Sequence, residues 1–325
     1  MTQPVLTVNN LQVTYFTEAG RVRALDGVNL TLNPGEKLGL VGESGSGKST
    51  MALAMMRMIK PPGRIEGGSV VVDGVDLTKL NDEEMREARL SRISYIPQGA
   101  MNSLNPVMRI GAQMRDAIKA HKLAPDADDI EKRINAALVS VDLKPTVAKM
   151  YPHELSGGMK QRVCIAIGIL LHPKLIIADE PTSALDVVTQ RQVMQTLDSV
   201  QKQLGAAIIL IGHDMGLMAQ FVDKVAVMYT GRLMELSTVQ DMFTNPQHPY
   251  AVALIKSLPN LNQRGVFHGI PGLAPALLRL PPGCSFHPRC PIAQDICKAQ
   301  VPPLEAKTPT RFVACHLVEK IKNEK

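Results

Sequence analysis

One glycine-rich segment constrains the fold of this 325-residue chain more than any other: Gly42-Glu43-Ser44-Gly45-Ser46-Gly47-Lys48-Ser49. It matches the Walker A pattern G-x-x-x-x-G-K-S, follows a short apolar run at 37–41 and precedes a stretch with helical spacing at 49–58. In such a strand, loop and helix, backbone N–H groups wrap around phosphate at the helix N-terminus. We therefore predict an α/β core in which residues 42–49 and Thr50 bind nucleotide. Lys48 would neutralise phosphate charge, and Ser49 would bind magnesium.

A pair of acidic residues ends another buried strand. Asp179 and Glu180 follow the apolar run at 175–178 and resemble a Walker B motif. The end of a buried strand can hold one carboxylate near Mg²⁺ and the next beside the water that attacks ATP. We predict Asp179 as a magnesium ligand and Glu180 as the catalytic base. The alternative is that the pair only caps the following helix.

The remaining pattern predicts a core with one insertion and one extension. Strands of a small sheet are expected at 6–13 and 27–32, with further strands at 68–72 and 93–96. Helical spacing at 107–120 and 130–141 predicts an inserted helical subdomain, about 99–160. The apolar strands 175–178 and 208–211, separated by a helix at 188–203, imply parallel pairing. We predict a nucleotide-binding domain over 1–244 and a proline-rich C-terminal extension over 245–325.

Composition excludes little beyond a membrane span. A formal charge of +6 and a pI near 9.0 do not decide between partners, because no block of like charge dominates any segment. The N-terminus has no basic region followed by an apolar stretch, and the longest apolar runs are far below the roughly 20 residues that cross a bilayer. We expect a soluble protein that docks on a membrane protein.

The segment Leu155-Ser156-Gly157-Gly158-Met159-Lys160-Gln161-Arg162 decides which class of phosphate-binding ATPase this is. It resembles the signature of ATP-binding-cassette (ABC) proteins and lies between Walker A and Walker B, as in that family. Three further matches follow the family order. Gln98 resembles the Q-loop glutamine, Ser183-Ala184-Leu185-Asp186 resembles the D-loop, and His213 resembles the switch histidine. Tyr15 resembles the aromatic residue that stacks on adenine, with Phe16 as the alternative.

The resemblance implies a RecA-like core with an antiparallel β subdomain, and a head-to-tail dimer with ATP between Walker A of one subunit and the signature of the other. Ser156, Gly157 and Gly158 would then contact the partner's ATP, and Asp186 would be a further nucleotide-site residue. Glu180, His213, Lys48 and Gln98 would be catalytic. Gln98 would also approach the magnesium bound by Ser49 and Asp179.

Three segments resemble one branch of the family, the oligopeptide, dipeptide and nickel importers: Ser103-Leu104-Asn105-Pro106, Tyr151-Pro152-His153-Glu154 and Asn245-Pro246-Gln247-His248-Pro249-Tyr250. The branch implies an ATPase that powers uptake of peptides or related small solutes, with oligosaccharides or nickel chelates as alternative cargo. Its partners would be a second homologous ATPase in a heterodimer, two transmembrane permease subunits and, indirectly, an extracytoplasmic solute-binding protein. It would lie on the cytoplasmic face of the membrane. Gly99-Ala100-Met101-Asn102, which faces the permease in the family, departs from the usual pattern.

A different class of function, an ABC-type DNA-repair ATPase, would explain the basic pI. Such proteins carry long coiled-coil or zinc-bearing insertions, whereas only a short helical insertion separates Gln98 from the signature. We therefore expect no nucleic-acid partner.

Four of the five cysteines, Cys284, Cys290, Cys297 and Cys315, cluster among prolines near the C-terminus. Apolar periodicity is low there, so a metal could supply missing stability. Similar cysteines in this importer branch are associated with a four-iron four-sulfur (4Fe-4S) cluster, and four thiolates are the required ligands. Zinc, or no metal, are the alternatives, with His287 and His316 as possible substitute ligands. Cys164 is expected to be a buried small hydrophobe.

Overall fold

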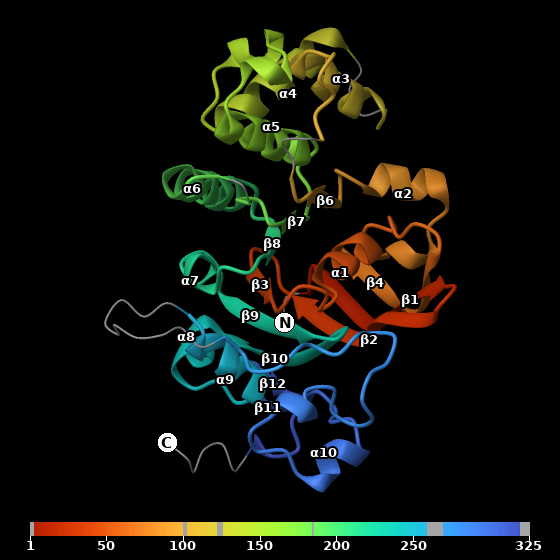
Figure 1. Ribbon diagram of the computed structural model, residues 1–325. Coiled ribbons are helices and arrows are strands. Elements are labelled where there is room, and N and C mark those ends of the chain that lie inside the picture. Colours follow the sequence, from red (N-terminus) through yellow and green to blue (C-terminus); the bar gives the residue numbers. More distant parts are fainter. Residues whose placement is uncertain (1–2, 100–102, 122–125, 184, 259–268, 319–325) are drawn as a thin grey trace.

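The computed structural model describes residues 3–99, 103–121, 126–183, 185–258 and 269–318 (Figure 1). A helical layer formed by α3, α4 and α5 lies at one end of the molecule, the two sheets occupy the middle, and the C-terminal residues lie at the opposite end. Among the described residues, none of the helices combines the length and the apolar character that crossing a membrane requires.

The smaller sheet is antiparallel, as predicted, with the strand order β2-β1-β4-β5. Its strands are β1 (Leu6–Thr17), β2 (Gly20–Leu32), β4 (Gly63–Val72) and β5 (Val75–Asp76). β1 and β2 are longer than the predicted strands because they form one continuous hairpin. The sequence hides this hairpin, since β2 is the edge strand and its first half carries exposed arginines at Arg21 and Arg23.

The larger sheet has the order β11-β12-β10-β9-β3-β8-β7-β6. The strands are β3 (Lys37–Val41), β6 (Ile93–Ile96), β7 (Leu175–Asp179), β8 (Ala207–Ile211), β9 (Lys224–Tyr229), β10 (Arg232–Thr238), β11 (Glu305–Thr308) and β12 (Arg311–Val313). β6, β7, β8, β3 and β9 run parallel, which confirms the predicted parallel pairing, and the remaining pairs are antiparallel. Every residue of β7 and β8 is buried, as expected for parallel strands covered on both faces.

Ten α-helices are described: α1 (Lys48–Met55), α2 (Asp82–Ala88), α3 (Ile110–Lys119), α4 (Ala127–Ser140), α5 (Gly157–Ile169), α6 (Val187–Leu204), α7 (Met215–Met218), α8 (Val239–Thr244), α9 (Pro249–Lys256) and α10 (Asp295–Ala299). Short 3₁₀ helices are η1 (Leu77–Lys79), η3 (Pro145–Lys149), η4 (Pro152–Glu154) and η5 (His287–Arg289). The helical insertion predicted between strands β6 and β7 is present. α4 begins earlier than predicted because the Asp126 carboxylate caps it, accepting the Asp129 N–H.

The C-terminal residues pack on the core more closely than the sequence indicated. β12 pairs with β10, so these residues extend the larger sheet. Phe286 is fully buried in the main core, with its ring 5.5 Å from that of Tyr229 and 5.2 Å from that of Tyr250. This aromatic cluster joins the end of β9, the start of α9 and the C-terminal loops into one core.

Candidate nucleotide site

The loop after β3 has a backbone that only glycine fits at two positions. Gly42 has φ 151°, and a Cβ there would lie 2.1 Å from the carbonyl oxygen of Met228. Gly47 has φ 103°, and a Cβ would lie 2.7 Å from the carbonyl oxygen of Ala24. These close approaches pack the loop against two neighbouring strands. Because α1 begins directly afterwards, the loop presents the N-terminus of a helix to a bound anion.

Lys48 is held by the loop itself. Its Nζ donates to the carbonyl oxygens of Gly42 at 2.7 Å and Glu43 at 2.9 Å, and to Ser46 Oγ at 3.3 Å. Burial lowers the pKa of Lys48, while the nearby carboxylates of Glu180 and Asp179 oppose that shift. An anionic phosphate beside this ammonium group would favour its charged form in the same way.

The loop forms one wall of a cavity of about 530 Å³. Tyr15, Val22, Ala24 and Leu277 form its apolar part, and its polar part includes the loop residues with Gln98, Glu180 and His213. The cavity thus brings together Tyr15, the phosphate loop and all four predicted catalytic residues, one of which, Lys48, belongs to the loop. Of the two aromatic candidates, Tyr15 lines the cavity. Phe16 instead contacts the guanidinium groups of Arg21 and Arg64, each 5.5 Å from its ring centroid.

Asp179 ends β7, directly before the cavity residue Glu180, and one of its carboxylate oxygens is available to bind a cation. Its Oδ2 accepts a hydrogen bond from the Tyr95 hydroxyl at 3.1 Å, while its buried Oδ1 has no hydrogen-bond partner among the described residues. Burial raises the pKa of Asp179, and the Ser49 and Tyr95 hydroxyls oppose the shift. An unsatisfied buried carboxylate oxygen next to a hydroxyl suits Mg²⁺, which prefers oxygen ligands. The residues present therefore fit the predicted magnesium site.

The side chain of Glu180 lies close to residues of two loops, Gln98 in the loop after β6 and His213 in the loop after β8. Gln98 Nε2 donates to its Oε2 at 2.8 Å, and His213 Nδ1 lies 3.6 Å from its Oε1. The backbone of Glu180 has φ 45°, a region that residues other than glycine seldom occupy, and its N–H donates to the Ile211 carbonyl oxygen at 2.9 Å. The bond to β8 keeps the carboxylate aimed at the cavity despite this strain.

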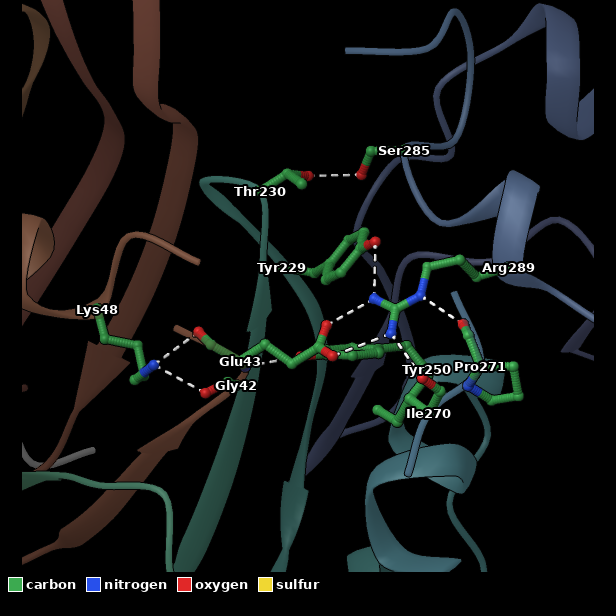
Figure 2. A network of polar contacts seen from close by, with 10 residues as sticks. All are labelled: Gly42, Glu43, Lys48, Tyr229, Thr230, Tyr250, Ile270, Pro271, Ser285 and Arg289. Carbon is green, nitrogen blue, oxygen red and sulfur yellow. Dashed lines mark hydrogen bonds and ion pairs between the residues drawn. The ribbon is translucent and has the colours of Figure 1, made fainter. Parts of the chain in front are cut away.

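The side chain of Glu43 points away from Lys48 and toward Arg289 of the C-terminal residues (Figure 2). Its carboxylate forms a two-pronged ion pair with Arg289, with Nη1 to Oε2 at 2.6 Å and Nη2 to Oε1 at 2.9 Å. Its backbone N–H donates to the Tyr250 hydroxyl at 2.8 Å. Glu43 therefore links the phosphate loop to residues more than 200 positions later in the chain.

The signature residues lie elsewhere. Ser156, Gly157, Gly158 and Asp186 are not among the described residues that line the cavity. Ser156 is the N-cap of α5 and its hydroxyl accepts the Met159 N–H. A Cβ on Gly158 would lie 2.5 Å from Thr189, whose hydroxyl donates to the Asp186 carboxylate at 2.6 Å. The signature and the D-loop are thus neighbours. Ala184 of the D-loop, and Ala100, Met101 and Asn102 after the Q-loop glutamine, lie outside the described residues.

The predicted iron–sulfur cluster is wrong. Within the part of the chain that the structure describes, no group of three or more His, Cys, Asp or Glu side chains could hold a metal ion. Cys284, Cys290, Cys297 and Cys315 are free cysteines. Burial raises the pKa of Cys284, Cys290 and Cys315, the last to about 11. The four thiols are therefore buried or half-buried side chains and do not form a ligand set.

A zinc ion would need the same cysteine ligands, so the absence of a ligand group among the described residues also rules against the zinc alternative. Cys284 and Cys290 pack against the main hydrophobic core. His287 Nδ1 contacts the Cys284 carbonyl oxygen and His316 Nε2 contacts that of Gln300. Cys164 is buried as predicted, and burial raises its pKa to about 11.

Three residues of the site and its surroundings were missed from the sequence. Tyr95 holds Asp179, Arg289 holds Glu43, and Leu277 lines the cavity. Tyr95 could have been found, since it lies in the predicted strand at 93–96, just before Gln98. A lone arginine and a leucine in a proline-rich segment carry no signal for an interaction with a loop near residue 43.

Known protein families match both the nucleotide-binding part and the C-terminal part of this chain. A model of the ABC transporter family matches residues 25–183, and one of the oligopeptide/dipeptide transporter C-terminal region matches residues 234–297. The oligopeptide transport ATP-binding protein OppD of Salmonella typhimurium is 47% identical over 313 residues, which cover 96% of this chain and 93% of that protein. The chain belongs to the ABC transporter family. The dipeptide transport ATP-binding protein DppD of Caldanaerobacter subterraneus is 41% identical, with 97% of each chain covered.

Solved structures of ABC proteins share the cassette fold. A dimeric ATP-binding cassette in a post-hydrolysis state, bound to ADP and Pi, superposes with a TM-score of 0.64 at 28% identity. It covers 72% of this chain, and 98% of that cassette is matched. CbiO1 of Clostridium perfringens, part of an ABC transporter complex, gives a TM-score of 0.62 at 27% identity, covering 74% of this chain and 91% of its own. The α/β fold of this chain is therefore that of an ABC ATPase cassette.

Proposed function

We propose that this chain is the ATP-binding and ATP-hydrolysing subunit of an ABC importer that takes up peptides. The single observation that carries the proposal is the cavity that brings the phosphate loop, Gln98, Glu180 and His213 together. The oligopeptide and dipeptide transport names of relatives at 41–47% identity support the cargo class.

Binding of ATP rests on the phosphate loop and on Tyr15. The loop N–H groups and Lys48 would hold the phosphates, and Tyr15 would stack on the adenine. Ser49 and Asp179 would hold Mg²⁺, with Gln98 approaching it. When bound, Mg²⁺ would neutralise charge that develops on the transferred phosphoryl group. The orphaned Oδ1 of Asp179 supports this assignment.

Hydrolysis would depend on Glu180. Its carboxylate can accept a proton from a water molecule placed in line with the terminal phosphate, in the manner of a general base. Gln98 holds one carboxylate oxygen and leaves the other facing His213. We assign Gln98 and His213 to orienting this carboxylate and the γ-phosphate end of the substrate.

A complete site would need a second subunit. Ser156, Gly157, Gly158 and Asp186 lie outside the cavity, which supports their use toward the ATP of a partner cassette in a head-to-tail dimer. The N-terminus of α5, capped by Ser156, is suited to a phosphate because its N–H groups point outward from a helix end. The similar cassette was solved as a dimer bound to ADP and Pi.

The partners follow from the same family membership. We propose a second homologous ATPase in a heterodimer, two transmembrane permease subunits and an extracytoplasmic binding protein that reaches the chain only through the permease. The chain would lie at the cytoplasmic face of the membrane. The permease and the binding protein would then select the cargo, and this subunit would supply the free energy of ATP hydrolysis.

Reconstitution of the chain with its permeases and partner ATPase in proteoliposomes tests the proposal. ATP hydrolysis should rise when the binding protein is loaded with an oligopeptide, and a Lys48→Ala variant of this chain should lose that response. Stimulation by a nickel chelate or an oligosaccharide, but not by peptide, would contradict the cargo class. Failure of the wild-type chain to hydrolyse ATP in the assembled complex would contradict the assignment of ATPase activity to this chain.

A further inference from the structure

A C-terminal segment, residues 270–279, lies against the nucleotide cavity; we call it the C-terminal strap. Leu277 of this strap lines the nucleotide cavity together with Tyr15 and Val22. The strap also lines an adjoining cavity of about 380 Å³ with Val22 and the phosphate-loop residues Glu43 to Ser46. Leu278 reaches the β1–β2 hairpin, where a Cβ on Gly20 would lie 3.1 Å from its Cδ1. In Figure 1 the strap accordingly passes beside β2.

Arg289 fastens the strap to the phosphate loop (Figure 2). Its Nε donates to the Pro271 carbonyl oxygen at 2.9 Å and its Nη2 to that of Ile270 at 3.2 Å. The same guanidinium group forms the ion pair with Glu43 and donates to the Tyr229 hydroxyl at 3.2 Å. The Arg289 side chain is only 4% exposed, so these partners replace water around a buried charge. A single side chain thus ties the start of the strap to the residue that follows Gly42.

The chemistry of the cavity indicates what the strap contacts. One part is polar, with Lys48, Ser49, Gln98 and Glu180, and suits phosphates and their cation. The other part is apolar and includes Tyr15, Val22 and Leu277. The apolar portion of a nucleoside triphosphate is its base, so burying the base requires this second wall.

We propose that Leu277 is a nucleotide-contacting residue that covers the base of ATP in its own chain's site, and that Arg289 is the positioning residue that holds the strap there. This inference rests on the proposed ATP site. It makes the C-terminal residues part of the nucleotide pocket, in addition to the Walker and signature elements of the cassette.

The planar geometry of Arg289 explains why the position requires arginine. A guanidinium group presents five donors in a fixed plane, so it can bind a carboxylate with two nitrogens and carbonyl oxygens with the others. Lysine would keep a positive charge beside Glu43 but could not reach the two strap carbonyls at the same time. Arg289→Lys should therefore release the strap while keeping the ion pair with the phosphate loop.

Calorimetric titration of the purified full-length chain tests the inference, with magnesium ATP and magnesium tripolyphosphate as the two ligands. Tripolyphosphate occupies the phosphate loop but carries no base. Leu277→Ala should weaken ATP binding about fivefold, for the loss of part of one apolar contact, and leave tripolyphosphate binding unchanged. Leu273→Ala is the matched control, because Leu273 belongs to the same strap but is 92% exposed and does not line the cavity.

Arg289→Lys should weaken ATP binding by a similar factor, again with tripolyphosphate binding unchanged. The double variant with Leu277→Ala should be no worse than either single variant, because both act through one contact. A purely structural role for Arg289 would instead weaken both ligands. Thermal melting of each variant reports whether it is folded, and Leu277→Ala keeps the test valid if Arg289→Lys does not fold.

Three results separate the possible failures. Wild-type ATP affinity in Leu277→Ala, with both ligands weakened by Lys48→Ala, would overturn the inference and leave the ATP site standing. If Leu277→Ala and Arg289→Lys together weaken ATP binding by the product of their separate factors, the positioning role of Arg289 is overturned. Unchanged ATP binding in Lys48→Ala would instead refute the proposed ATP site itself.

Discussion

Burial of His248 predicts that the folded protein loses stability in mild acid. His248 is 1% exposed at the N-terminus of α9, where its Nδ1 accepts the Tyr250 N–H at 3.0 Å. Its own backbone N–H donates to Glu235 Oε2 at 2.7 Å. Burial lowers the pKa of His248 from 6.5 to about 3, and a hydrogen bond to the backbone of Ala314 only partly opposes this shift. The imidazole is therefore neutral in the native protein across the physiological range.

The sign and size of the effect follow from linkage. Between pH 6.5 and pH 3 the unfolded chain binds a proton at His248 and the native protein does not, so the free energy of unfolding falls as pH falls. The contribution is complete above pH 6.5 and is lost progressively below it. At about 1.4 kcal/mol per pKa unit, acidification from pH 7 to pH 5 should cost about 2 kcal/mol from this residue alone.

Urea denaturation at pH 7 and pH 5, followed by circular dichroism, measures this loss. The comparison is with His248→Asn, which keeps a side-chain oxygen to cap α9 but does not titrate. The pKa of the neighbouring Glu235 is raised by burial, and its contribution is present in both proteins and cancels in the difference. The wild type should lose about 2 kcal/mol more than the variant between the two pH values. Equal losses would refute the reasoning.

Three further predictions concern single side chains. Tyr95→Phe removes the hydroxyl that holds Asp179 Oδ2, so the Mg²⁺ concentration for half-maximal ATPase activity should rise about threefold to tenfold, with little change at saturating Mg²⁺; an unchanged Mg²⁺ requirement would contradict this. Ser156→Arg should slow hydrolysis of ATP held by the partner's Walker A, while ATP binding at Lys48 of the same chain persists; an effect confined to its own chain's nucleotide would rule out the head-to-tail dimer. Because burial raises the pKa of Cys315 to about 11, iodoacetamide at pH 8 should alkylate it about a hundredfold more slowly than a thiol of ordinary pKa, and rapid alkylation would show that the site is open.

The core of the fold could be predicted because its constraints are local. The phosphate loop needs glycine at defined positions, which gives a recognisable motif in the sequence. Strands β7 and β8 are buried on both faces, so each appears in the sequence as a short apolar run. The helical insertion was found from its apolar spacing, although α4 started at the Asp126 cap and not at the first apolar residue.

The C-terminal part was predicted poorly because its contacts are distant in sequence. Every residue of β11 is exposed, so this strand has no alternation to read, and its partner β12 has three residues. The ion pair between Arg289 and Glu43 spans 246 positions. The clustering of cysteines suggested a metal, whereas the aromatic core around Phe286 and the pairing of β12 supply the packing that the sequence did not reveal.

The assignment of Glu180 as the base that activates water is the central claim, and Glu180→Gln in this chain tests it most directly. Glutamine keeps the size of the side chain and an oxygen for Gln98 to bind, but it cannot accept the proton of the attacking water. In the assembled transporter, hydrolysis at this chain's own site should fall by about two to four orders of magnitude. Binding of ATP should remain at its wild-type level, because the phosphate loop is intact. Near-normal hydrolysis at that site by the variant would contradict the account.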